Sequence, residues 1–165
     1  MVTDPAPAPS FRLTDRSGGP LSLRDLRGRT VVLSFIYTHC PDACPLLAAN
    51  YVQIQREFAT ALDQDNLALV FVTVDPERDS PQRLEQYTQA MGGRWFFLTG
   101  SMAEVAEVWR GYELHREVRE RTKELVVFHS YKTFLIDKEG MVRIKHTGVW
   151  YPRDIIPDVR RLLTE

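Results

Sequence analysis

The chain has 165 residues, a formal net charge of -1 and only two cysteines. A chain of this length forms one domain that buries roughly 70% of the surface its unfolded form exposes, so it needs no disulfide framework or metal to fold. The even mixture of acidic and basic residues argues against a nucleic-acid or membrane-surface binder. No run approaches the roughly 18 apolar residues of a membrane helix, and no secretion signal is present.

The first ten residues, Met1 to Ser10, are rich in proline and alanine. Such a composition is typical of an extended, semi-rigid tether. We expect residues 1–10 to be either a tether left after removal of a membrane anchor or the disordered N-terminus of a cytoplasmic protein. Residues 11–165 are expected to form the single domain.

The first half of this domain reads as strands alternating with helices. Phe11 to Leu23 predicts a hairpin that covers a sheet edge. Thr30 to Tyr37 is an almost continuous β-branched and aromatic run, which indicates a central strand buried on both faces. Helical spacing begins near Pro45, and Leu67 to Val74 predicts a second buried strand.

Capping signals mark the elements that follow. Ser80 and Pro81 open a helix that runs to about Met91, and Ser101 begins a capping box for another. Between them, Trp95 to Leu98 is a short strand candidate. The charge-alternating stretch from Glu113 to Glu124 predicts a solvated hairpin or loop, and we assign it no function.

The chain ends in a hairpin and a helix. Lys132–Asp137 and Met141–His146 are the hairpin strands, and Pro152–Leu163 has the spacing of an amphipathic helix despite its internal proline. This order predicts an α/β protein with a thioredoxin-like layered fold: a central mixed sheet flanked by helices, with an N-terminal hairpin and a C-terminal hairpin plus helix.

Cys40 and Cys44 lie where the first buried strand turns into a helix. If Cys40 caps that helix, Pro41 takes its first position; otherwise Pro45 takes it and the cysteines form a loop over the helix entrance. In both arrangements the sulfurs lie near the positive end of the helix, which favours their thiolates. The pair is therefore expected to bind a soft metal or to cycle with a disulfide.

The donor types favour copper over zinc. Two thiolates and one imidazole suit Cu(I), and His with Cys also serves Cu(II), whereas a closed zinc site needs a fourth ligand. The best imidazole candidate is His129, because it precedes an apolar strand that could present it at the same sheet edge. His39 is expected to point away from Cys40, and the surface is the expected location of His115 and His146.

Three blocks of the sequence resemble the Sco/SenC copper-protein family. They are the segment from Tyr37 to Pro45, the segment from Val74 to Pro81 (Val-Asp-Pro-Glu-Arg-Asp-Ser-Pro), and His129-Ser130 before Phe134–Asp137. The resemblance extends from about Phe11 to the C-terminus, and its cysteine and Asp-Pro-Glu-Arg-Asp blocks are specific.

The resemblance implies a thioredoxin-like fold that binds one copper ion, Cu(I) or Cu(II), through Cys40, Cys44 and His129. It also implies an extracytoplasmic location with an N-terminal membrane anchor that this chain lacks. The implied role is in building the dinuclear copper centre of cytochrome c oxidase, with its copper-accepting subunit or another copper chaperone as partner. A monomer is expected. Many relatives carry Asp where this chain has Phe128, and Asp75 or Asp79 is a candidate substitute, although either could equally cap a turn.

The favoured function is a copper-binding assembly factor, or metallochaperone, rather than a turnover enzyme. The alternative is a thiol-disulfide oxidoreductase that reduces the cysteines of the copper site. The three residues between Cys40 and Cys44 argue against general thioredoxin activity, which uses two. A peroxidase is disfavoured because Thr38 stands two positions before Cys40 rather than three.

Overall fold

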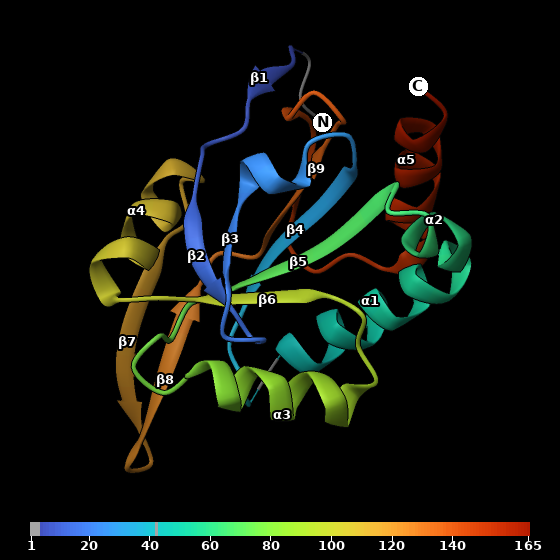
Figure 1. The fold of residues 1–165 in the computed structure, drawn as a ribbon. Coiled ribbons are helices and arrows are strands. Elements are labelled where there is room, and N and C mark those ends of the chain that lie inside the picture. The colour runs from blue at the N-terminus through green and yellow to red at the C-terminus, as the bar shows by residue number, and fades with distance from the viewer. Residues whose placement is uncertain (1–3, 42) are drawn as a thin grey trace.

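The computed structural model describes residues 4–41 and 43–165, which build a mixed sheet with helices on both faces (Figure 1). The eight strands of the main sheet lie in the order β1-β10-β9-β4-β5-β6-β2-β3, and two further strands, β7 and β8, form a separate sheet. The strands are β1 (Ala6–Pro7), β2 (Arg12–Asp15), β3 (Pro20–Ser22), β4 (Thr30–Ile36), β5 (Leu67–Thr73), β6 (Phe96–Thr99), β7 (Arg116–Arg121), β8 (Glu124–His129), β9 (Lys132–Ile136) and β10 (Met141–Thr147). The helices are the 3-10 helix η1 (Leu23–Leu26) and α1 (Cys44–Glu57), α2 (Ala59–Asp63), α3 (Pro81–Met91), α4 (Met102–Gly111) and α5 (Pro152–Thr164).

The centre of the sheet is the parallel pair β4 and β5. Every residue of both strands is buried, as their β-branched and aromatic runs predict. Thr30 pairs with Leu67 and Ile36 with Thr73, so the two strands end level with each other. The loops that follow β4 and β5 therefore leave the same edge of the sheet side by side.

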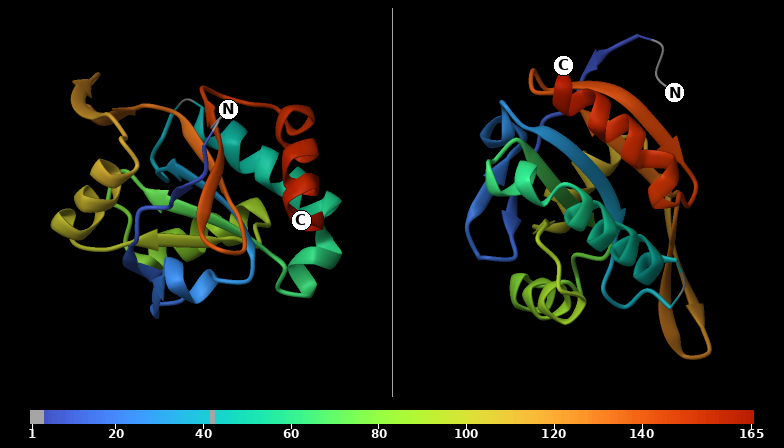
Figure 2. Two further views of the ribbon diagram at one scale, coloured as in Figure 1. Left: turned by 90° about the horizontal axis from the view of Figure 1, so that it is seen from above. Right: turned by 90° about the vertical axis from the view of Figure 1, so that its right-hand side faces the viewer.

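Helices α1, α3 and α5 cover one face of the sheet and α4 covers the other (Figure 2). On the first face the ring of Tyr51 in α1 stacks on Phe71 with centroids 4.0 Å apart. On the opposite face Tyr112, just after α4, packs edge-on against Phe134 at 4.9 Å. Trp150, which precedes α5, is 3% exposed and donates to the Thr133 hydroxyl.

Most predicted elements are confirmed, and the N-terminal segment needs a correction. β2 and β3 form the expected edge hairpin. Ala6 and Pro7, expected in a tether or disordered terminus, instead pair with β10, and the Ala8 N–H donates to the Gly140 carbonyl. An open strand edge offers unpaired backbone groups, and proline is tolerated there because it needs no partner for an N–H. Residues 1–3 of the expected tether lie outside the described residues.

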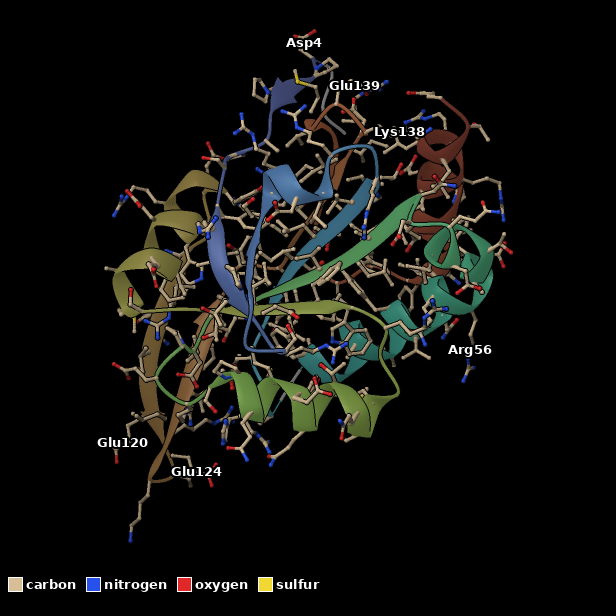
Figure 3. The ribbon with its side chains drawn as sticks, in the orientation of Figure 1. Asp4, Arg56, Glu120, Glu124, Lys138 and Glu139 are labelled. Carbon is tan, nitrogen blue, oxygen red and sulfur yellow. The ribbon has the colours of Figure 1, made fainter. Side chains whose placement is uncertain are left out.

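The β7–β8 hairpin projects from the body of the protein (Figures 1 and 2). Its turn places Thr122 and Lys123 at positive φ, and Glu120 and Glu124 near this end reach away from the protein (Figure 3). β8 delivers the chain to His129. Among the described residues, no helix is long and apolar enough to cross a membrane.

Candidate metal centre

The two cysteines lie on different kinds of backbone. α1 begins at Cys44, with Ala43 as its N-cap and Pro45 as its second residue. The proposal that Cys40 caps the helix is therefore wrong, and the loop alternative holds except that Pro45 takes the second position and not the first. A helix begun at Pro41 would place Pro45 at its fifth residue, where the missing N–H would leave the Pro41 carbonyl without its helical partner. Pro45 thus confines the helix to Cys44 onward and leaves Cys40 in the loop.

Cys44 is fully buried and Cys40 is half-buried, and no disulfide joins them. A hydrogen bond with Cys40 raises the pKa of the Cys44 thiol, and burial and negative charge on Cys40 raise it further. A main-chain hydrogen bond from Tyr37 opposes these effects without outweighing them. In the metal-free protein Cys44 therefore keeps its proton at neutral pH.

The imidazole of His129 faces the thiol pair, as the sequence predicted. Its Nδ1 lies 3.1 Å from the Ser130 carbonyl, which can only accept, so Nδ1 carries the proton. The unprotonated Nε2 lies 3.9 Å from the Cys44 Sγ. Burial lowers the pKa of His129, opposed by the bond to Ser130, so the ring is neutral and its Nε2 lone pair is available as a ligand.

Aromatic side chains surround this imidazole. The ring centroid of Tyr131 lies 4.8 Å from that of His129, and the edge-on ring of Tyr37 lies 6.2 Å away. A cavity of about 340 Å³ opens beside them and is lined by Tyr37, Cys40, Pro41, Arg121, Val126, Val127, Phe128, His129 and Tyr131. Cys40 lines this cavity, whereas Cys44 is buried from solvent. Access to the site is thus from the Cys40 side.

The separation of Cys44 and His129 fits a shared ion. Ligands about 2.3 Å (sulfur) and 2.0 Å (nitrogen) from one ion, at a trigonal angle, lie roughly 3.7 Å apart. Within residues 4–41 and 43–165, however, no three His, Cys, Asp or Glu side chains already enclose a point where an ion could sit. The three predicted ligands form two neighbouring pairs, Cys40 with Cys44 and Cys44 with His129.

The other histidines have partners of their own. The His39 ring Nδ1 lies 3.1 Å from the Thr38 hydroxyl, and the side chain lines a second hollow with Pro41 and Arg78. His115 is exposed, and His146 is half-buried with its Nε2 3.1 Å from Asp158. The expectation for His115 is confirmed, His146 is only partly at the surface, and the direction of His39 relative to Cys40 stays a prediction.

Neither candidate carboxylate orients the imidazole. Ser130 supplies the acceptor for His129 Nδ1–H, a role that an acidic neighbour could otherwise take. Asp75 pairs with Arg78 at 2.5 Å, and the buried Asp79 accepts hydrogen bonds from Thr38 and Thr73. Phe128 is 39% exposed and lies under the Arg119 guanidinium.

The sequence missed the importance of the β7–β8 hairpin. The stretch from Glu113 to Glu124, to which we assigned no function, ends at the first residue of the strand that carries His129. Arg121 in this stretch lines the cavity beside Cys40. The one available signal was the apolar run from Leu125 to Phe128, which is unusual for a fully solvated loop.

Comparison with known proteins decides the family. The SCO1/SenC family model matches residues 3–164. The chain belongs to the SCO1/SenC family. The mouse mitochondrial protein SCO2 homolog is 32% identical over 153 residues, which cover 92% of this chain and 60% of that protein. A SCO2-like protein of Rickettsia typhi is 31% identical over 143 residues, covering 83% of this chain and 68% of that relative.

Solved structures of SCO1/SenC proteins share the fold. Copper-bound ScoI of Bradyrhizobium japonicum matches with a TM-score of 0.83 and 28% identity over 95% of this chain and 99% of that one. Apo Sco1 of Thermus thermophilus matches with a TM-score of 0.80 and 26% identity over 98% of this chain and 94% of the other. The expected thioredoxin-like fold is confirmed. The chain spans 60% of the mouse relative and 50% of the human SCO2 homolog.

The different exposure of the two thiols predicts different reactivity. In the folded, reduced, metal-free protein, iodoacetamide should modify Cys40 at least about tenfold faster than Cys44, because Cys44 is buried and its pKa is raised. Fragmentation mass spectrometry of the peptide that contains both residues measures the two rates. In urea the rates should become similar; equal rates in the folded protein would contradict this geometry.

Proposed function

We propose that this protein is a copper-binding assembly factor that holds one copper ion through Cys40, Cys44 and His129. The observation that carries the proposal is the unprotonated Nε2 of His129, which lies 3.9 Å from the buried Cys44 sulfur although 85 residues separate them in sequence. Copper-bound structures of two similar proteins, from Bradyrhizobium japonicum and Arabidopsis thaliana, support the choice of ion.

The three ligands have separate roles. Cys44, at the start of α1, and His129, at the end of β8, are held by secondary structure and form the fixed part of the site. Cys40 lies in the loop beside the cavity, hydrogen-bonded to Cys44, and would complete the site. A bound copper ion supplies a Lewis acid that displaces the thiol protons. Because Cys40 is the ligand nearest solvent, it is the first that a partner can replace.

We further propose the setting in which such a site works. Similar proteins include mitochondrial SCO homologues, a lipoprotein of Bacillus anthracis and a Sco protein described as a member of a family of cytochrome c oxidase assembly proteins. These support an extracytoplasmic location and a role in building the dinuclear copper centre of that oxidase. The partner that approaches the site from the Cys40 side is then the copper-accepting oxidase subunit or another copper chaperone.

Copper titration of the reduced protein tests the ligand set. We expect one equivalent to bind, with thiolate-to-copper charge-transfer absorption when Cu(II) is used. His129→Ala should weaken binding by about 10- to 100-fold, because a ligand is removed from a site whose thiols remain. His115→Ala, an exposed histidine outside the site, is the matched control. Unchanged affinity in His129→Ala would remove that residue from the site.

The pH dependence of copper affinity should come from the thiols. The pKa of Cys44 is raised and that of His129 is lowered, so above about pH 6.5 the metal-free site holds the Cys44 proton but no imidazolium. Copper must displace that proton, and affinity should fall as the pH falls, by about one log unit per pH unit for Cys44 alone and by up to about two if Cys40 also ionises on binding. Affinities measured from pH 6.5 to 8 should give the same slope for His129→Ala as for the native chain. A smaller slope in that variant would mean that His129 also loses a proton.

The accessible Cys40 beside a buried Cys44 also favours a second function, thiol-disulfide oxidoreductase. The Cys40 thiolate would attack a partner disulfide, forming a mixed disulfide and releasing one partner thiolate. Cys44 would then lose its proton and attack Cys40, releasing the second partner thiolate and leaving a Cys40–Cys44 disulfide. The two electrons come from the pair, and an external thiol must restore it.

Metal-free protein mixed with a disulfide peptide tests this second function. One peptide should be reduced per protein, and Cys44→Ser should stop at the mixed disulfide, which mass spectrometry detects. If the native chain reduces no disulfide while it binds copper, the second function is excluded and the first is retained.

A further inference from the structure

We infer that the turn after β5, Asp75 to Asp79, positions both halves of the proposed copper site: Asp79 fixes the loop that carries the thiols, and Arg78 fixes the strand that carries His129. Only the copper-affinity test of this inference rests on the proposed function. In this role Arg78 acts through its hydrogen bond to Leu125, and Asp79 acts through its hydrogen bonds from Thr38.

Asp79 holds the start of the thiol loop. Its carboxylate is fully buried and accepts three hydrogen bonds, two from Thr38 and one from Thr73. The Thr38 N–H donates to Oδ2 at 3.2 Å and its hydroxyl donates to Oδ1 at 2.5 Å. Arg83 donates to the same Thr38 hydroxyl at 3.1 Å. Thr38 precedes Cys40 by two residues, so these bonds set where the loop leaves β4.

Arg78 holds the imidazole strand from the other side. Its Nε donates to Asp75 at 2.5 Å, which directs the guanidinium toward the hairpin. Its Nη2 then donates to the Leu125 carbonyl of β8 at 2.9 Å. Two residues further along β8, the Val127 N–H donates to the Tyr37 hydroxyl at 3.1 Å. β8 is therefore fixed at alternate residues on its way to His129.

The shape of the turn makes this double contact possible. The N–H groups of Arg78 and Asp79 both donate to the Asp75 carbonyl, at 3.2 and 3.0 Å, so the chain coils tightly before α3. In this coil Arg78 is partly exposed and lies next to the hairpin, while Asp79 is directed inward to the end of β4. Glu77 between them is exposed. This turn of five residues therefore contacts both the end of β4, which leads to the thiols, and β8, which leads to His129.

Hydrogen exchange of the metal-free protein tests the two contacts separately. Arg78→Ala should speed exchange of the amides from Val126 to His129 at least about threefold and leave the Thr38 amide unchanged, because the charge-assisted bond to β8 is lost while the bonds from Thr38 to Asp79 remain. Asp79→Asn should do the reverse, since an amide group cannot accept all three bonds made by the carboxylate. Glu77→Ala, in the same turn, is the control and should change neither.

A double-mutant cycle, read out as copper affinity, separates positioning of His129 by Arg78 from a general structural role of Arg78. Arg78→Ala should weaken copper binding by about tenfold in the native chain and by nothing further in the His129→Ala background, because its effect passes through the imidazole. Arg94→Ala, which removes an exposed arginine paired with Asp63, is a control of equal chemistry and should leave binding unchanged.

Two results would overturn the inference. The first is that the amides from Val126 to His129 exchange at the same rate in Arg78→Ala as in the native chain. The second is that Arg78→Ala weakens copper binding equally in the native chain and in the His129→Ala background. If His129→Ala binds copper as the native chain does, the proposed ligand set fails, and hydrogen exchange alone then decides whether the turn positions the two segments.

Discussion

The parallel pairing of β4 and β5 is the constraint on which the site depends. Their register ends both strands at one edge of the sheet, and parallel strands place their carboxyl ends together. The thiol loop follows β4 and the Asp75–Asp79 turn follows β5, so contacts between them arise from the order of the sheet. Shifting either strand by one residue would turn its side chains to the opposite face and separate the two loops.

The proposed site joins side chains from two separate sheets and their flanking elements. Cys44 begins a helix whose Tyr51 is buried against the sheet, whereas His129 ends a strand of a two-stranded sheet outside the main one. The fixed tautomer of His129, set by the carbonyl of Ser130, and the retained proton of Cys44 give the metal-free site two neutral neighbouring groups. A cation that displaced the Cys44 proton would have its positive charge offset, in part or in full, by the thiolate that forms beside it.

The sequence predicted the central strands, most helix starts and the pairing of a distant histidine with the thiols. These features depend on local signals: β-branched runs, the Ser80 and Ser101 caps, and a short motif. The start of α1 was left open because Pro41 and Pro45 are both acceptable near the first position of a helix. The structure decides for Cys44, because the missing N–H of Pro45 disfavours a helix that begins at Pro41. The turn of the β7–β8 hairpin lacks the glycine or asparagine that usually marks such turns, because Thr122 and Lys123 occupy its positive-φ positions. The contact of Arg78 with a backbone carbonyl leaves no trace in the sequence pattern.

The separation of β7 and β8 from the eight-stranded sheet has a consequence for stability near His129. The backbone pairs of β7 and β8 are made with each other, so His129 depends on a different set of hydrogen bonds from the seven paired positions of β4 and β5. Local opening of this small sheet and unfolding of the main sheet are therefore separate events. A substitution in the buried core lowers the stability of the whole protein, whereas one in β7 or β8 changes the order of the segment that carries the imidazole.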